Sequence, residues 1–334
     1  MERNPTSHFV ASNELYEASL KQKHSFIRRA LLALWTVLGL GGLIWFAWAE
    51  PFSGRLLSSL IADGAPAWAI NWLALPLVMM LRAVLLVESA GYAYHRFMQH
   101  VGWFTRRAQA IRKNQRFHWI HHMVIYPIGR FYKRTAKYIP SEKGLSLSWF
   151  LPALLITGLF LLTHGFNIGT LAFIAGFALF AKYVVDEAHS RFHEAKHSWV
   201  GKRYFTWLEE IHLLHHWDQR FNFTIVHPAM DWLFGTYLAP RKYRKELAES
   251  VKESAVTVSD MINWRYLLIE ATPVEYAAFI SAARRNPRAL RKIGLLISIL
   301  SDRSATHPED AQARDLHQKA QDLLKALGDT PTTK

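Results

Sequence analysis

Histidine is the residue type in this sequence that could do chemistry, because its seventeen copies are concentrated in short motifs. A neutral imidazole offers a ring nitrogen that suits iron, zinc or copper. Ten histidines form, in chain order, the motifs H-x4-H, H-x2-HH, H-x3-H and a second H-x2-HH. Their members are His95 and His100; His118, His121 and His122; His189 and His193; His212, His215 and His216. One ion takes about four to six ligands, so ten histidines predict a centre for two metal ions.

The spacing of the motifs indicates helices that carry the ligands. Positions i, i+3 and i+4 share one helix face, so each H-x2-HH motif is expected to direct three imidazoles toward one point. The five-residue spacing of His95 and His100 fits an α-helix less well and predicts a distortion or a helix end between them. The sequence contains no cysteine, which excludes disulfides and cysteine-ligated zinc or iron–sulfur sites.

The other seven histidines are not expected to be ligands, except that His197 and His227 are left open. The remaining five are His8, His24, His164, His307 and His317. A zinc metalloprotease is one alternative, because residues 193–197 read H-E-x-x-H, with His193 and His197 as ligands and Glu194 as the base. That interpretation leaves the other motifs unexplained. A membrane protein that binds metal without catalysis is a further alternative.

Four apolar runs accompany the motifs and predict an all-α integral membrane protein with about four transmembrane helices. They cover residues 30–49, 67–87, 147–163 and 168–185. A bilayer core of about 30 Å needs roughly twenty apolar residues in a helix, so the third run is at the short limit. Arg82 and Lys182 lie near the ends of the second and fourth runs, where their side chains are expected to reach the interface.

The distribution of basic residues predicts the orientation. The net charge is +14, and together with the apolar runs it favours anionic lipid rather than nucleic acid as a partner. The segment between the second and third runs is strongly basic, which places it and both termini in the cytoplasm. We therefore expect a cytoplasmic leader (residues 1–29), a membrane domain (residues 30–243) with the metal site in a cytoplasmic helical cap, and a polar helical tail (residues 244–334). A bacterial inner membrane is the expected location.

A basic stripe in the central segment is a candidate site for lipid head groups. Its members lie at positions i, i+3, i+4 and i+7, and they are Arg130, Lys133, Arg134 and Lys137. Such a stripe is typical of a helix that lies at the membrane interface. This stripe either controls the access of a lipid substrate to the metal site or only holds the segment at the membrane surface. Nearer the last two histidine motifs, Asp186 and Glu187 are candidates to accept the second N–H of a ligating imidazole.

The order of the four motifs resembles the fatty acid hydroxylase/sterol desaturase superfamily of membrane di-metal oxygenases. The segments that follow the last motif are similar as well, because Asn222-Phe223 and Asp231-Trp232-Leu233-Phe234-Gly235-Thr236 resemble the family's N-[YF]-G and D-x-x-F-G-T segments. Thr224 stands where the family usually has glycine, which leaves the subfamily open. The resemblance covers about residues 81–240.

The resemblance implies that the ten histidines bind two iron ions, which zinc can replace in purified protein, and that the enzyme uses O2 to hydroxylate an alkyl or acyl lipid. A fatty acyl group and a bacterial aminolipid are candidate substrates, and desaturation and sterol methyl oxidation are alternative reactions. Asn222 and Asp231 become candidates to support the ligating rings. No G-x-G-x-x-G motif or fused redox domain is visible, so electrons from NAD(P)H are expected to arrive through a separate ferredoxin- or cytochrome-type protein. The oligomeric state is left open.

Overall fold

The computed structural model describes most of the chain between residues 26 and 328. The described residues are 26–49, 53–100, 109–126, 138, 145–242, 267–268, 273–284, 305 and 311–328. They form helices, turns and loops, with no β-strand among them. The expected all-helical class is therefore confirmed for this part of the chain. The basic stripe, His8, His24, His307 and the expected boundary at residues 243/244 lie outside the described residues.

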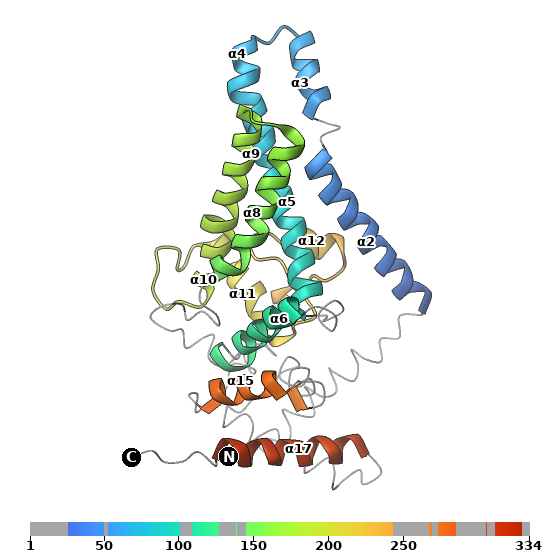
Figure 1. Cartoon of the computed structure of the whole chain (residues 1–334), viewed down its shortest axis with the longest axis vertical. Coiled ribbons are helices and arrows are strands. Elements are labelled where there is room, and N and C mark those ends of the chain that lie inside the picture. Colours follow the sequence, from blue (N-terminus) through green and yellow to red (C-terminus); the bar gives the residue numbers. More distant parts are fainter. Residues whose placement is uncertain are drawn as a thin grey trace.

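Four helices form the elongated upper part of the molecule in Figure 1, which we call the stalk. They are α2 (Phe26–Ala49), α5 (Leu75–Ala93), α8 (Leu145–His164) and α9 (Ile168–Leu179). Beyond them, α3 (Ser53–Ala62), α4 (Ala67–Ala69) and the π-helical segment η1 (Ile70–Ala74) form the tip. Asn167 begins α9 by accepting a hydrogen bond from the backbone N–H of Thr170 at 2.9 Å.

The elements beside and below the lower end of the stalk form its foot, where the histidine motifs lie. They are η2 (Tyr94–His100), α6 (Gln109–Ile120), η3 (His121–Ile125), η4 (Phe180–Asp186), α10 (Glu187–Phe192), α11 (Arg203–Trp217) and α12 (Ala229–Leu233). Farthest from the stalk lie α15 (Pro273–Arg284) and α17 (Ala311–Gly328) (Figure 1). These two tail helices are joined by a hydrogen bond from Arg284 Nη2 to the carbonyl of Ala326, at 2.7 Å.

Close packing holds the stalk together. The rings of Phe160 on α8 and Phe173 on α9 stack with their centroids 3.7 Å apart. Gly176 lets α9 approach α5, because a Cβ at this position would lie 3.0 Å from the Cα of Met80. Lipid tails are as apolar as these side chains, so close contacts of this kind, rather than the hydrophobic effect, hold helices together within a bilayer.

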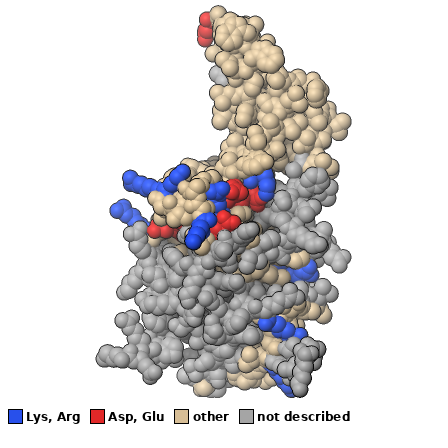
Figure 2. All heavy atoms as spheres, turned by 90° about the vertical axis from the view of Figure 1, so that its left-hand side faces the viewer, with Lys and Arg blue, Asp and Glu red and all other residues tan. Residues whose placement is uncertain are grey.

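The outer surface of the stalk is apolar. Its exposed large side chains include Val37 and Leu38 on α2, Leu81 on α5 and Leu155 and Leu162 on α8. Figure 2 shows the stalk as a column almost free of charged side chains, while the described Lys, Arg, Asp and Glu side chains gather mainly where the column meets the rest of the molecule. Soluble proteins rarely expose such a continuous apolar surface.

Two helical stretches are long and apolar enough to cross a membrane, judged by length and composition. They are Ala67–His100 and Ile168–Phe192, and they contain the second and fourth predicted spans. The first and third predicted spans coincide with α2 and α8, whose described apolar parts, Ala33–Trp48 and Leu154–His164, are shorter. The structure thus supports two of the four predicted spans by length and composition.

Arg82 does not reach the interface as expected, because it is buried between helices with only 6% of its surface exposed. Its Nε donates to the carbonyl of Ala47 at 3.1 Å, and its Nη2 donates to the carbonyl of Trp48 at 2.8 Å. These carbonyls belong to the last turn of α2, which has no further helical N–H groups to satisfy them. Arg82 therefore joins α5 to the end of α2. Lys182, in contrast, is exposed and pairs with Asp186.

Replacing Arg82 should destabilise the stalk. In Arg82→Met, the carbonyls of Ala47 and Trp48 lose a charged donor, which should lower the free energy of unfolding by about 1–3 kcal/mol. Thermal unfolding in detergent measures the change, and Lys182→Met is the control because exposed ion pairs contribute little. Equal stabilities for the two variants would contradict this role of Arg82.

Candidate metal centre

Nine of the ten motif histidines form two groups at the foot of the stalk. In each group the possible ligand atoms lie within 4.8 Å of one another. The first group is His95, His100, His118, His122 and His215, and the second group is His121, His193, His212 and His216. His189 is the tenth, and its ring centroid lies 5.0 Å from that of His121 and 4.9 Å from that of His212. Buried histidine clusters of this kind could hold metal ions.

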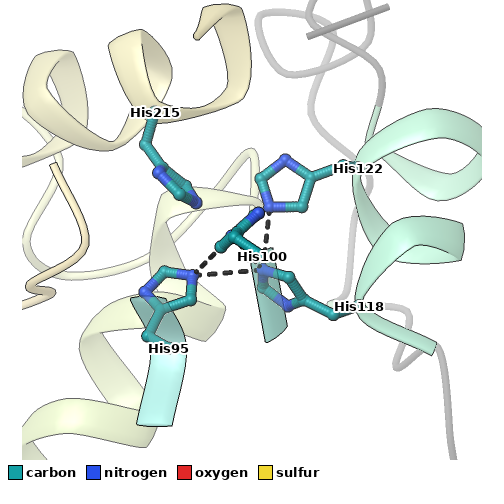
Figure 3. Close-up of side chains that lie close together, drawn as sticks. All are labelled: His95, His100, His118, His122 and His215. Atoms are coloured by element: carbon teal, nitrogen blue, oxygen red, sulfur yellow. Dashed lines mark hydrogen bonds between the residues drawn. The ribbon is translucent and has the colours of Figure 1, made fainter. Parts of the chain in front are cut away.

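The rings of the first group converge on a common point (Figure 3). The Nε2 atom of His118 lies 3.1 Å from that of His95, 2.8 Å from that of His100 and 3.0 Å from that of His122. The Nε2 atoms of His95 and His100 are 3.1 Å apart. A ring nitrogen carries either one proton or one lone pair, so it cannot form three such hydrogen bonds at once.

A metal ion accounts for these separations. With metal–nitrogen bonds of about 2.1 Å, neighbouring ligands of an octahedral ion lie about 3 Å apart. The separations of 2.8–3.1 Å within the first group agree with this value. In the second group, the Nε2 atoms of His193 and His212 are also 3.1 Å apart. Both groups therefore fit a metal by ligand type and by spacing.

The H-x4-H motif reaches the first group through a π-helical segment. Residues 94–100 form η2, which continues α5. In a π-helix the hydrogen bonds join residues five apart, so this geometry brings His95 and His100 onto one face. The distortion expected from their spacing is therefore confirmed.

Each H-x2-HH motif contributes to both groups, which differs from the expectation that its three rings meet at one point. His118 and His122 belong to the first group, whereas His121 belongs to the second. His212 and His216 belong to the second group, whereas His215 belongs to the first. Consecutive residues on a helix point about 100° apart, so the two adjacent histidines of a motif face different points. The two groups are therefore neighbours, and the rings of His122 and His216 lie 4.1 Å apart.

Backbone carbonyls fix the orientation of three rings. The Nδ1–H groups of His95 and His215 donate to the carbonyls of Phe223 and Phe221, and that of His216 donates to the carbonyl of Tyr126 at 2.8 Å. A carbonyl can only accept, so each of these rings is protonated at Nδ1 and directs the Nε2 lone pair inward. Such partners are usual for metal-bound histidines.

Burial keeps the imidazoles neutral. Loss of solvation lowers the pKa of His118, His122 and His212 well below the usual range, and neighbouring imidazoles lower it further. The same causes lower the pKa of His216 to about 3, although its hydrogen bond to Tyr126 acts in the opposite direction. Neutral rings at pH 7 have the free lone pairs that a metal requires.

Asn222 and Asp231 support the rings indirectly. Asn222 adopts a positive φ of 55°, and its side chain bonds to the carbonyls of Ile211 and Leu238 and to the N–H of Leu238. Asp231 accepts from the N–H groups of Phe223 and Thr224, each at 2.9 Å. Both residues thus hold the loop of residues 221–224, whose carbonyls orient His95 and His215.

The other described candidates do not belong to the two groups of histidines. Asp186 pairs with Lys182, and Glu187 pairs with Arg191, one helical turn away in each case. His227 accepts a hydrogen bond from the N–H of Ala229. His164 stacks on Phe160 in the stalk, and His317 lies on α17. The basic stripe of Arg130, Lys133, Arg134 and Lys137 lies outside the described residues.

The H-E-x-x-H sequence does not form a metal site of the protease type. α10 ends at Phe192, so His193 and His197 do not share a helix face. His193 belongs to the second group, whereas His197 accepts a hydrogen bond from the N–H of Trp199. Glu194 accepts one from the N–H of Tyr138 at 3.2 Å. This geometry does not support the protease alternative.

Several residues at the centre had no signal in the sequence. Tyr126 is fully buried, stacks on His193 with centroids 3.9 Å apart, and orients His216 through its carbonyl. The carbonyls of Phe221 and Phe223 act in the same way, and any residue type would supply them. Only the family-like segment around Asn222 drew attention to this loop. Comparisons with protein-family models, with curated proteins and with solved structures gave no match.

Metal content should depend on both groups. We expect two ions per chain, and one ion in His118→Ala or in His212→Ala, because each variant disrupts a single group. His164→Ala, outside both groups, should keep two ions. Mass spectrometry of the metal in purified protein measures the ratio. Loss of metal in the His164 variant would contradict the assignment. Two ions per chain in the other two variants would contradict it as well.

The two histidines of the H-E-x-x-H sequence should behave differently. His193→Ala should lose one ion, whereas His197→Ala should keep both, because His197 lies outside the two groups. A zinc protease would lose its metal in both variants. The same measurement of metal per chain distinguishes these outcomes.

Proposed function

We propose that this chain is a membrane di-iron oxygenase that hydroxylates an alkyl or acyl lipid. The observation that carries the proposal is the pair of adjacent, buried, all-histidine groups at the foot of an apolar stalk. A structural zinc site typically has four ligands and holds a single ion. Two groups that share their motifs favour a pair of ions that act together.

Iron is favoured over zinc because oxygen chemistry requires a change of oxidation state, which zinc lacks. Iron held by these histidines would supply the activation of O2: with two external electrons and two protons, one oxygen atom would be inserted into a C–H bond and the other would leave as water. The chain contributes neutral imidazoles held by carbonyls, and buried surroundings that exclude bulk water. Water exclusion protects reactive species from side reactions.

A lipid is the favoured substrate because η2 and α10, which carry three of the motif histidines, directly continue the apolar helices of the stalk. Charged side chains gather where the apolar column meets the rest of the molecule (Figure 2). Trp35 on α2, Tyr183 on η4 and Trp232 on α12 are all more than half exposed in the foot or the lower stalk. Trp and Tyr are enriched at the boundary between lipid and water. A lipid that enters from the bilayer would therefore bring its chain close to the histidines.

The proposed topology has four spans, formed by α2, by the stretch that includes α5, by α8 and by α9 with η4. The metal centre and both termini then lie in the cytoplasm, as the basic segments favour. On this side a ferredoxin- or cytochrome-type protein, reduced by NAD(P)H, would deliver the electrons. The described residues hold no redox cofactor motif of their own.

Membership of the fatty acid hydroxylase/sterol desaturase superfamily forms part of the proposal. The order of the histidine motifs supports it, and so do the contacts of the two segments that follow them. Asp231 of the second segment binds the N–H groups of Phe223 and Thr224 in the first. These contacts explain physically why the two segments would occur together with the histidines.

Lipid mass spectrometry tests the reaction. Membranes of cells that express the chain should contain one lipid class shifted by about 16 mass units, the mass of one oxygen atom. Cells that express His118→Ala should lack this product, and His197→Ala should retain it. A loss of about 2 mass units would indicate desaturation. No shift in any lipid class would overturn the proposed reaction while leaving metal binding intact.

A further inference from the structure

The helix α2 is in direct contact with the segment that follows the last histidine motif. A Cβ at Gly39 would lie 2.9 Å from Cε1 of Phe234, so the ring packs directly against the backbone of α2. Phe234 is fully buried, and it shares its cluster with Leu40 and Tyr92. Trp35 adds a hydrogen bond from Nε1 to the carbonyl of Leu233 at 3.2 Å.

The segment around Phe234 holds the loop of residues 221–224. The carbonyl of Thr236 accepts from the N–H of Asn222 at 2.8 Å. The hydroxyl of Thr236 donates to Asp231 at 2.7 Å, and Asp231 in turn binds Phe223 and Thr224. A displacement of this segment would therefore move the loop with it, because these hydrogen bonds are buried and breaking them would cost free energy.

The loop acts on the first group of histidines. Its two carbonyls, from Phe221 and Phe223, orient His215 and His95, and both rings belong to that group. In the second group, the carbonyl that orients His216 comes from Tyr126. Tyr126 directly follows η3 and lies outside the loop of residues 221–224. A shift of α2 would thus act on two rings of the first group through these carbonyls, whereas the carbonyl that orients His216 does not belong to the loop.

We propose that α2 positions the first metal site through Phe234 and Asp231, so that metal affinity in this group depends on how α2 packs against the foot. Phe234 and Asp231 are positioning residues, because they belong to neither histidine group and act on His95 and His215 through the loop. The inference rests on the metal binding proposed above and is independent of the oxygen chemistry. No metal binding at all would overturn the proposed centre, whereas the variants below test the positioning alone.

Three glycines of α2 provide a matched test. Gly39→Ala places a methyl group against the buried ring of Phe234, whereas a Cβ at Gly41 or Gly42 meets no atom within 4 Å. All three substitutions change the helix propensity by the same amount. Loss of an outer support of a metal ligand typically weakens metal affinity 10- to 100-fold. We expect at least a roughly tenfold weaker affinity in Gly39→Ala and no change in Gly41→Ala or Gly42→Ala.

The two groups are measured separately with Zn²⁺ as the probe. The His212→Ala background keeps the first group, and the His118→Ala background keeps the second. Competition with a chelating dye should show that Gly39→Ala weakens binding only in the His212→Ala background. Equal weakening in both backgrounds would indicate general destabilisation and overturn the proposal, as would no weakening in either.

Two further variants keep the test decisive if Gly39→Ala folds poorly, which the thermal unfolding of the metal-free protein reveals. Trp35→Phe removes the hydrogen bond to Leu233 and keeps an aromatic ring at this position, so it should weaken metal binding by the first group alone and by a smaller factor. Phe234→Leu replaces the ring that opposes residue 39 with a shorter side chain. Combined with Gly39→Ala, it should recover part of the lost metal affinity of the first group. Failure of both expectations would overturn the route through Phe234.

Discussion

The close approach of imidazole nitrogens is the constraint on which the rest of the structure depends. Within the first group, Nε2 atoms lie 2.8–3.1 Å apart. Lone pairs at such distances repel unless a cation lies between them, and protonating the rings would place several positive charges in a buried space. A bound metal ion would satisfy all of these nitrogens at once. Because the rings repel one another without a cation, the surrounding foot must hold them in place, and it does so through π-helical segments and backbone carbonyls.

Helix geometry makes the two groups dependent on each other. Adjacent histidines point about 100° apart, so His121 and His122 face different groups although they are neighbours in sequence. The same holds for His215 and His216. A rotation of α6 or α11 that improved one group would disturb the other. The shared motifs therefore place both groups close together and restrict how either helix can move.

The sequence predicted that the motif histidines gather, that helices carry them and that η2 is distorted, because these features depend on residue identity and spacing. The sharing of each H-x2-HH motif was not predicted, since it depends on how far apart the two sites lie. The carbonyls of Phe221, Phe223 and Tyr126 leave no trace in residue identity. Arg82 was expected at the interface, but the carbonyls at the end of α2 attract it into the interior. Its partners come from another helix, which spacing along one run cannot reveal.

The departure at Thr224 from the family-like pattern has a physical explanation. The loop needs one residue with a positive φ, and among the described non-glycine residues Asn222 alone adopts this conformation. Position 224 therefore has no need of glycine. Thr224 instead donates both its N–H and its hydroxyl to Asp231, whereas glycine could donate only the N–H. The extra hydrogen bond ties the loop more firmly to the segment that packs on α2.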